Sequence, residues 1–281
     1  MVEDTGTDVK NEADKDASKA SDAQPPTSGS SSSDEATRRA MRRKWIIENV
    51  KSFGIAIFLV LIIRSSIIEA FKIPSGSMIP TLMVGDHIFV NKFAYGLKVP
   101  FSDFFTDKPL YIVERQQPQR GDIIVFKYPK DESFYYIKRV IGVPGDRIRI
   151  REKVVYVNDK PLDRVAVTDK PDIIANLEGR QYDKTSLELY NELNPTTNER
   201  HLVMFDKNSY INENYGETKV PDGHLFVMGD NRDFSNDSRF WGFVPFKNVR
   251  GKAMVIWLSL WIDFGEREFY FHPSRIGTII K

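Results

Sequence analysis

The chain opens with a long polar stretch and then contains one long apolar run. Residues 1–37 are rich in Ser, Asp, Lys, Glu and Ala and hold almost no large apolar side chains, so burial cannot offset the entropy lost on ordering. The apolar run at 53–63 reads FGIAIFLVLII, which is shorter than the roughly 20 residues that a bilayer requires. Extending it to 46–68 gives enough length, with Lys51 and Arg64 near the ends, where they reach the headgroups. We therefore predict a disordered tail over 1–44 and a single transmembrane helix over 45–69.

Basic residues immediately before this helix orient it. The cluster comprises Arg38, Arg39, Arg42, Arg43 and Lys44. By the positive-inside rule the N-terminus is cytoplasmic and everything after about residue 70 lies on the outer face. A buried core helix is the alternative; a cleaved signal peptide is disfavoured because the basic region does not begin near residue 1.

Beyond about residue 86 the apolar pattern becomes that of β-strands. Short runs rich in β-branched and aromatic residues are separated by Gly-Asp, Pro-Gly-Asp and Asn-Asp turns. The predicted strands are 87–91, 121–128, 134–141, 147–150, 154–157, 224–228 and 253–262. The last of these is predicted as a core strand, with contact of Trp257, Trp261 or Phe264 with the outer leaflet as the alternative.

Between about residues 161 and 220 the chain is more polar, which indicates an inserted, less densely packed subdomain. The predicted fold is mostly β, with the N-terminal helix followed by a β-sheet catalytic core that carries a smaller inserted β subdomain. The predicted divisions are the tail 1–44, the anchor 45–69, the core 70–152, the insert 153–222 and the rest of the core 223–281.

The composition of the chain excludes several classes of function and of catalytic or metal site. The length of 281 residues favours about two domains, and a net charge of +1 gives no argument for binding nucleic acid. The absence of cysteine excludes disulfides, thiolate metal sites and cysteine nucleophiles. The four histidines show no metal-ligand spacing.

A stretch directly after the predicted anchor carries two hydroxyls in apolar surroundings. It reads FKIPSGSMIPTLMVGD over 71–86. Pro74 and Pro80 favour an irregular loop, and Gly76 allows close backbone approach. Ser75 and Ser77 are thus candidates for an oxyanion donor and a nucleophile. The alternative is a simple turn leading out of the anchor.

A serine nucleophile needs a base, and Lys138 is the candidate. On a strand it shares one face with Phe134, Tyr136 and Val140, which would desolvate its ammonium and lower its pKa from the usual value of about 10.4. The alternative is an ordinary solvated lysine. A third stretch, GDNRDFSNDSR at 229–239, is dense in short polar residues and indicates a supporting hydrogen-bond network.

Together these stretches resemble the bacterial type I signal (leader) peptidases, which are membrane-bound Ser–Lys proteases. The matching motifs are PSGSMIPTL at 74–82, RGDIIVF at 120–126, YIKRVIGVPGD at 136–146 and the stretch at 229–239. They occur in the family's order and cover the anchor and nearly all of the β body. The chain departs from some members in having one anchor rather than two and in lacking the cysteines of their disulfide.

The resemblance implies a role for individual residues. Ser77 matches the nucleophile, Lys138 the general base, and Ser75 the side-chain oxyanion donor that acts with the Ser77 amide. Ser235 matches the hydroxyl that orients the lysine. Asp230, Asp237 and Arg239 match the family's supporting network. The residues that match its shallow substrate pockets are Phe71, Ile73, Leu82, Tyr136 and Ile137.

The resemblance also implies an activity and a location. The expected enzyme is a serine endopeptidase that removes N-terminal signal peptides after a small-x-small motif through an acyl-enzyme, without metal or cofactor. Its expected partners are preproteins, the lipid bilayer and a nearby export translocase, and no nucleic acid. It is expected in the bacterial inner membrane as a single-pass protein, with the catalytic domain periplasmic or otherwise extracytoplasmic.

Other readings stay open at this point. A related self-cleaving Ser–Lys protease, a pilin-processing relative and a membrane-tethered scaffold with a degenerate site would share these features. A Ser-His-Asp hydrolase is disfavoured, because only His87 and His224 lie near the motifs.

Overall fold

The computed structural model describes residues 31–96, 113, 116–168, 174, 177, 182–194, 197–211, 213–263, 265 and 268–281. The first 30 residues of the predicted tail lie outside this set. The chain divides into two compact units, Met1–Ile55 and Ala56–Lys281.

Helix α1 runs over Ser31–Ser66. It begins before residue 45, so the prediction of a disordered tail is wrong for 31–44. Glu35, near its start, interacts favourably with the helix dipole and stabilises the helix. Arg39 Nη2 also lies 3.5 Å from Glu35 Oε2, one turn earlier. No helix among the described residues is both long enough and apolar enough to cross a bilayer. The transmembrane helix predicted over 45–69 stays a prediction.

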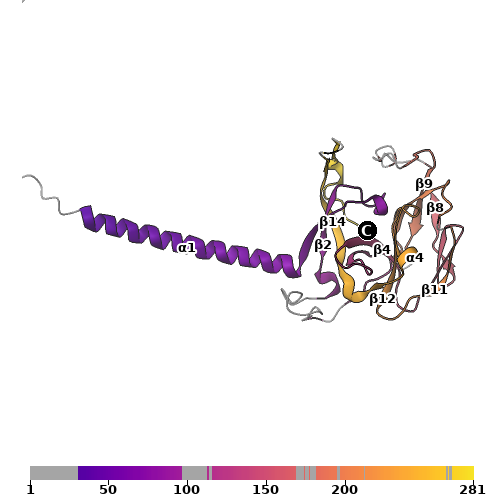
Figure 1. Cartoon of the computed structure of the whole chain (residues 1–281), viewed down its shortest axis with the longest axis horizontal. Coiled ribbons are helices and arrows are strands. Elements are labelled where there is room, and N and C mark those ends of the chain that lie inside the picture. The colour runs from indigo at the N-terminus through magenta and orange to yellow at the C-terminus, as the bar shows by residue number, and fades with distance from the viewer. Residues whose placement is uncertain are drawn as a thin grey trace, which may run out of the picture. The chain divides into compact units, whose positions relative to one another are not determined.

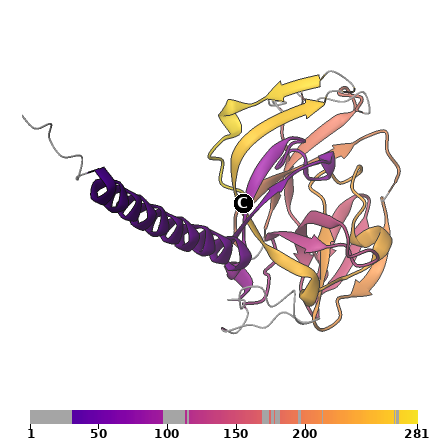
Figure 2. The same ribbon diagram turned by 60° about the vertical axis from the view of Figure 1, so that its left-hand side comes forward.

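The largest sheet has eight antiparallel strands in the order β1-β2-β14-β3-β4-β12-β13, with β15 paired to β14 (Figure 1). Figure 2 shows β14 as a long, strongly bent strand that ends in its hairpin with β15. The strands are β1 (Ile68–Lys72), β2 (Asp86–Asn91), β3 (Ile123–Lys127), β4 (Tyr135–Gly142), β12 (His224–Met228), β13 (Val244–Pro245), β14 (Val249–Asp263) and β15 (Glu268–Phe271).

Two smaller antiparallel sheets complete the body, in the orders β11-β5-β6-β7 and β10-β9-β8. Their strands are β5 (Arg147–Arg151), β6 (Val154–Val157), β7 (Lys160–Pro161), β8 (Arg164–Ala166), β9 (Leu187–Leu193), β10 (Arg200–Asp206) and β11 (Tyr215–Lys219). The mostly-β prediction is confirmed. Because β5 pairs with β6, one sheet crosses the predicted boundary between 152 and 153, and the domain divisions stay predictions.

Short helices join the strands. They are η1 (Gly76–Met78), η2 (Phe93–Tyr95), α4 (Ser238–Trp241), η3 (Phe246–Asn248) and η4 (Pro273–Arg275).

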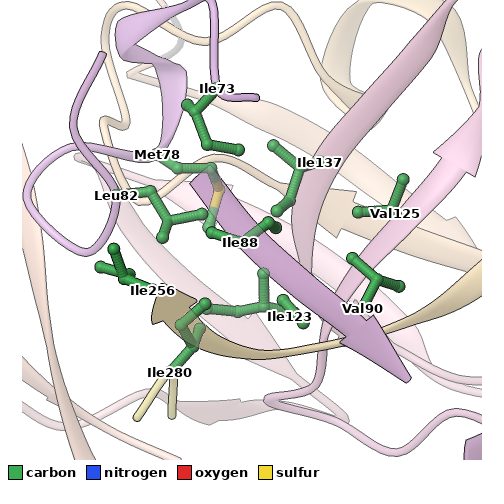
Figure 3. Close-up of a cluster of buried hydrophobic side chains, with 11 residues drawn as sticks. Ile73, Met78, Leu82, Ile88, Val90, Ile123, Val125, Ile137, Ile256 and Ile280 are labelled. Carbon is green, nitrogen blue, oxygen red and sulfur yellow. The ribbon is translucent and has the colours of Figure 1, made fainter. Parts of the chain in front are cut away.

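One apolar cluster ties the segment after β1 to the centre of the large sheet (Figure 3). Met78 and Leu82 are completely buried and pack with alternate residues of β2, β3 and β4. The cluster comprises Ile73, Met78, Leu82, Ile88, Val90, Ile123, Val125, Ile137, Ala253, Ile256 and Ile280. Burial of this size fixes the loop that carries the two serines against a rigid sheet.

Candidate active site

The loop with the two serines folds into the one-turn 3-10 helix η1. Ser75 precedes it in an extended conformation, with φ −132° and ψ 151°. Gly76 packs so closely on the Tyr182 hydroxyl that a Cβ atom at position 76 would overlap it. A larger residue at position 76 would therefore have to displace the Tyr182 and Ile79 side chains. Ser77 follows and is buried except for 8% of its surface.

Lys138 reaches Ser77 from strand β4. Its Nζ lies 2.6 Å from Ser77 Oγ and 2.9 Å from the carbonyl oxygen of Ile137. Burial lowers the pKa of Lys138 from 10.5 to about 8; the charges of Asp237 and Asp230 oppose this shift, and Arg239 adds to it. An amine with this pKa is partly neutral near neutral pH, so it can accept a proton from the serine hydroxyl.

The two serine hydroxyls face each other across η1, with 3.4 Å between Ser75 Oγ and Ser77 Oγ. Ser77 is the second residue of η1, so its N–H has no acceptor within that helix. A hydroxyl and a free amide beside a nucleophile are the donors that stabilise a tetrahedral oxyanion.

Two buried ion pairs hold the loop over 229–239 behind the lysine. Asp230 accepts hydrogen bonds from Arg139 at 2.8 and 2.7 Å and from the Thr81 hydroxyl. Arg139 also donates to the carbonyl oxygen of Gly121. Arg139 follows Lys138 on β4, so its side chain lies on the opposite face of that strand. Its pairing with Asp230 ties that strand to the loop.

Asp237 organises the other end of the loop. Its carboxylate accepts from Arg239 Nε and Nη2, both at 2.8 Å, and from the Gly229 amide at 3.0 Å. It also caps helix α4. Gly229 packs directly on the carbonyl oxygen of Ser77 and on Ser235, leaving no room for a Cβ atom. Asp230 and the Asp237–Arg239 pair thus form two groups of contacts at the two ends of the loop.

Ser235 does not make the contact expected of it. The side chain is buried, and its Oγ has no hydrogen-bond partner among the described residues. The hydrogen bonds of Lys138 Nζ go instead to Ser77 and to the backbone. Sequence resemblance places the residue near the lysine but does not specify its rotamer.

The five predicted pocket residues divide into two groups. Ile73, Leu82 and Ile137 are buried in the apolar cluster of Figure 3. Phe71 and Tyr136 are only partly buried. Phe71 lies edge-on to Tyr135, with 5.4 Å between ring centroids. A substrate would therefore contact Phe71 and Tyr136 directly, whereas Ile73, Leu82 and Ile137 would contribute mainly through packing.

Sequence reasoning missed several residues of this site. Asn231, Thr81 and Arg139 all contact the segments that carry the predicted chemistry. All three lie inside the quoted motifs, and that is the only signal that could have pointed to them. Among the described residues no hydrogen bond joins His87 or His224 to Ser77: His87 Nδ1 lies 3.0 Å from Gly85 O, and His224 Nδ1 lies 2.9 Å from Asp222 O. In the part of the chain that the structure describes, no cluster of His, Asp and Glu could hold a metal ion.

Comparison with known proteins points to one family. Residues 46–258 match the family described as "Signal peptidase, peptidase S26". Signal peptidase I of Pseudomonas aeruginosa is 41% identical, with 83% of this chain and 79% of the relative covered. Signal peptidase I of Buchnera aphidicola subsp. Schizaphis graminum is 40% identical over 84% and 85% of the two chains. A crystal structure of a signal peptidase I from Enterococcus faecalis V583 is 27% identical, covers 49% of this chain and 97% of that one, and gives a TM-score of 0.29.

Proposed function

The chain belongs to the signal peptidase family, peptidase S26, and from this premise we propose that it removes N-terminal signal peptides from exported preproteins. Membership makes the chain a serine peptidase and confirms the family predicted from its motifs. Ser77 is the proposed nucleophile and Lys138 the general base, and the reaction passes through an acyl-enzyme.

One observation carries this proposal: the 2.6 Å contact between Lys138 Nζ and Ser77 Oγ at a buried position. With a pKa of about 8, roughly one lysine in ten is neutral at pH 7, whereas at the usual pKa fewer than about one in a thousand would be. Burial thus raises the population of the basic form by more than about a hundredfold.

In the first half-reaction, neutral Lys138 takes the Ser77 hydroxyl proton as Oγ attacks the scissile carbonyl carbon. The oxyanion that forms accepts hydrogen bonds from Ser75 Oγ and from the Ser77 N–H. When the C–N bond breaks, the Lys138 ammonium gives its proton to the departing amine, which is the N-terminus of the mature protein. Ser77 then carries the signal peptide as an ester.

In the second half-reaction, a water molecule gives a proton to Lys138 and attacks the ester carbonyl. The C–Oγ bond breaks, Ser77 regains its proton from the lysine, and the signal peptide leaves with a free carboxylate. Asp230, Asp237, Arg239 and Ser235 support the geometry of the dyad and do not exchange protons with substrate.

The proposed substrate lies extended beside the loop that carries Ser77, with the residues before the scissile bond against Phe71 and Tyr136. Phe71 packs against the apolar cluster that contains the buried residues Ile73, Leu82 and Ile137, so we expect no deep pocket beside it. Shallow apolar pockets accept small side chains and reject large ones, which is the basis for the proposed small-x-small motif.

We further propose that residues 45–69 anchor the enzyme in the bacterial inner membrane, with a cytoplasmic N-terminus and an extracytoplasmic catalytic body. The basic cluster before this segment and the apolar residues within it support that orientation. Tethering raises the effective concentration of the enzyme at the bilayer, where preproteins emerge near the export translocase.

The test is cleavage of a detergent-solubilised preprotein by the wild type, Ser77→Ala and Lys138→Ala between pH 6 and 10. Ser133→Ala and Lys130→Ala, at exposed positions in the turn before β4, are the matched controls. We expect a single cut after the small-x-small motif, a loss of more than about a thousandfold in both site variants, and full activity in the controls. Activity of the wild type should rise with pH toward about 8, because only the neutral lysine is a base.

A preprotein with a bulky residue in place of the small residue before the cut should resist cleavage. A wild type that cuts no preprotein would refute the proposed function. Substantial activity in Lys138→Ala would refute the proposed base.

A further inference from the structure

Asn231 is buried against the nucleophile loop, and the reaction described above gives it no role. The residue is 0% exposed and follows Asp230 in the loop over 229–239. Its side-chain Nδ2 donates to the carbonyl oxygen of Gly76 at 2.9 Å, and its backbone N–H donates to that of Ser77 at 3.2 Å. One residue thus holds two successive carbonyl groups of η1, from 155 positions away along the chain.

The first of these carbonyls belongs to the peptide group that links Gly76 to Ser77. A peptide group is planar, and its C=O and N–H point in opposite directions. The carbonyl oxygen held by Asn231 and the N–H of Ser77 are therefore two ends of one rigid unit. Fixing the oxygen at one end sets the direction of the N–H at the other.

A hydrogen bond to the carbonyl also polarises the peptide group. Donation to the oxygen draws electron density from the nitrogen, so the N–H becomes a stronger donor. The effect is largest where water is excluded, and both partners are buried or partly buried here.

We propose that Asn231 is a positioning residue for the oxyanion site, aiming and polarising the Ser77 N–H through the Gly76–Ser77 peptide group. This inference rests on the proposed function, because it assigns a task to the same nucleophile loop. Asn231 touches neither the substrate nor the reacting atoms and acts only through the backbone.

The surroundings of the amide fix its orientation. Nδ2 has a second acceptor in the Tyr182 hydroxyl at 3.4 Å, whereas Oδ1 is buried without a hydrogen-bond partner among the described residues. Turning the amide over would set two oxygens, Oδ1 and Gly76 O, against each other. An aspartate in this place would present only acceptors when ionised, so it could not replace the asparagine.

The experiment compares Asn231→Ala and Asn231→Asp with Asn248→Ala. Asn248 is a suitable control because it is also buried and its Nδ2 donates to a carbonyl oxygen, that of Lys127, at 3.1 Å. It lies on η3, and its side-chain hydrogen bond goes to strand β3 rather than to the loop that carries Ser77. Both alanine variants lose one buried side-chain to backbone hydrogen bond, so both lower stability by a similar amount.

Three measurements distinguish a positioning role of Asn231 from a purely structural one: the steady-state kinetics, the binding of an aldehyde compared with a product peptide, and the pH profile. We expect Asn231→Ala to lower kcat about a hundredfold with KM changed less than about threefold. A peptidyl aldehyde with alanine at the cleavage position, which forms an oxyanion on Ser77, should bind about a hundredfold more weakly. The product signal peptide, which forms no oxyanion, should bind the variant and the wild type alike.

The pH profile gives the third readout. The acid limb of Asn231→Ala should coincide with that of the wild type, because the variant leaves the surroundings of Lys138 unchanged. Asn231→Asp adds a carboxylate to the loop beside the lysine, so it should lose at least as much kcat and shift the limb to higher pH. Asn248→Ala should keep wild-type kcat, aldehyde affinity and pH profile.

The inference is overturned if Asn231→Ala keeps wild-type kcat, or if it weakens the aldehyde and the product peptide equally. It also fails if Asn248→Ala shows the same kinetic loss. The two proposals fail in different ways, since aldehyde binding does not require a preprotein. A wild type that cuts no preprotein, but binds the aldehyde in an Asn231-dependent way, would refute the proposed function and retain this inference.

Discussion

Lys138 and Arg232 are two buried basic residues in the catalytic body, and their surroundings shift the two pKa values in opposite directions. Lys138 meets a hydroxyl and a carbonyl oxygen, and burial lowers its pKa to about 8. Arg232 meets the carboxylate of Glu192 in a two-bond pair. Burial alone would lower the pKa of Arg232 as well, but Glu192 raises it above the usual value.

The difference shows that burial alone does not set the protonation state. Glu192 is itself completely buried, which would raise its pKa, yet Arg232 brings that pKa down to about 2. A paired charge stays ionised inside a protein, whereas an unpaired one loses its charge more readily. The pair on β9 therefore fastens the loop over 229–239, whereas the lone amine on β4 is free to exchange a proton.

Breaking the pair should have the largest effect on stability. Glu192→Gln leaves Arg232 as a buried, uncompensated cation, so we expect a loss of about 3–5 kcal/mol in the free energy of unfolding. Denaturant unfolding at pH 7 measures it. Glu188→Gln is the matched control, because Glu188 lies on the same strand but is exposed, and its loss should be below about 0.5 kcal/mol.

The pair also predicts an acid-sensitive stability. The folded-state pKa of Glu192 is about 2 against 4.5 in the unfolded chain, so its contribution is complete above about pH 4.5 and is lost as the pH falls toward 2. Unfolding measured across this window should differ in slope between the wild type and Glu192→Gln. Equal slopes would contradict the pairing.

Removing the Lys138 amine should change the free energy of unfolding by a smaller amount, and it should stabilise the protein. We expect Lys138→Met to be inactive and to remove the cost of burying an unpaired charge, partly offset by two lost hydrogen bonds. We expect a gain of about 1–3 kcal/mol at pH 7. Above about pH 8 the folded wild type binds one proton fewer than the unfolded chain, so its stability rises with pH until about 10.5.

The advantage of Lys138→Met should therefore shrink between about pH 8 and pH 10.5. Thermal or denaturant unfolding of both proteins at pH 7, 8, 9 and 10 tests this. A variant that is less stable than the wild type at pH 7 would mean that the lysine is held as a paired charge.

The smallest change in stability is expected at Lys153, which has a carboxylate partner, as Arg232 does, and a carbonyl partner, as Lys138 does. Its Nζ donates to Asp233 at 2.9 Å and to the carbonyl oxygen of Asp206 at 2.7 Å. In Lys153→Met, Asp233 keeps a backbone donor, the Asp206 amide at 2.8 Å, so we expect a loss of only about 1 kcal/mol. A loss as large as that of Glu192→Gln would show that a backbone donor does not compensate a buried carboxylate.

The sequence allowed much of this to be predicted, for physical reasons that differ by region. Strands such as β3 and β4 were found because runs of β-branched and aromatic residues mark a buried sheet. The start of α1 was missed because a polar segment with few apolar residues has no burial pattern, although propensity and charge pairs can still support a helix.

Side-chain contacts were harder to predict than elements. The motifs grouped Ser77 with Lys138, but the partner of Arg139, the missing bond of Ser235 and the clamp made by Asn231 depend on rotamers and on segments far apart in the chain. The pairing of Glu192 with Arg232 joins strand β9, which lies in no quoted motif, to the loop over 229–239. Such contacts arise only once the backbone has folded.

The strand order described above also constrains when the site can form. β14 lies between β2 and β3, although its residues follow those strands by more than a hundred positions. Contacts of such long range are the slowest to form, because the intervening chain must be closed into loops first. A nascent chain that ends before residue 249 lacks the middle of its largest sheet, and we expect it to be inactive. We therefore expect proteolytic activity to appear only after nearly the whole chain has been made.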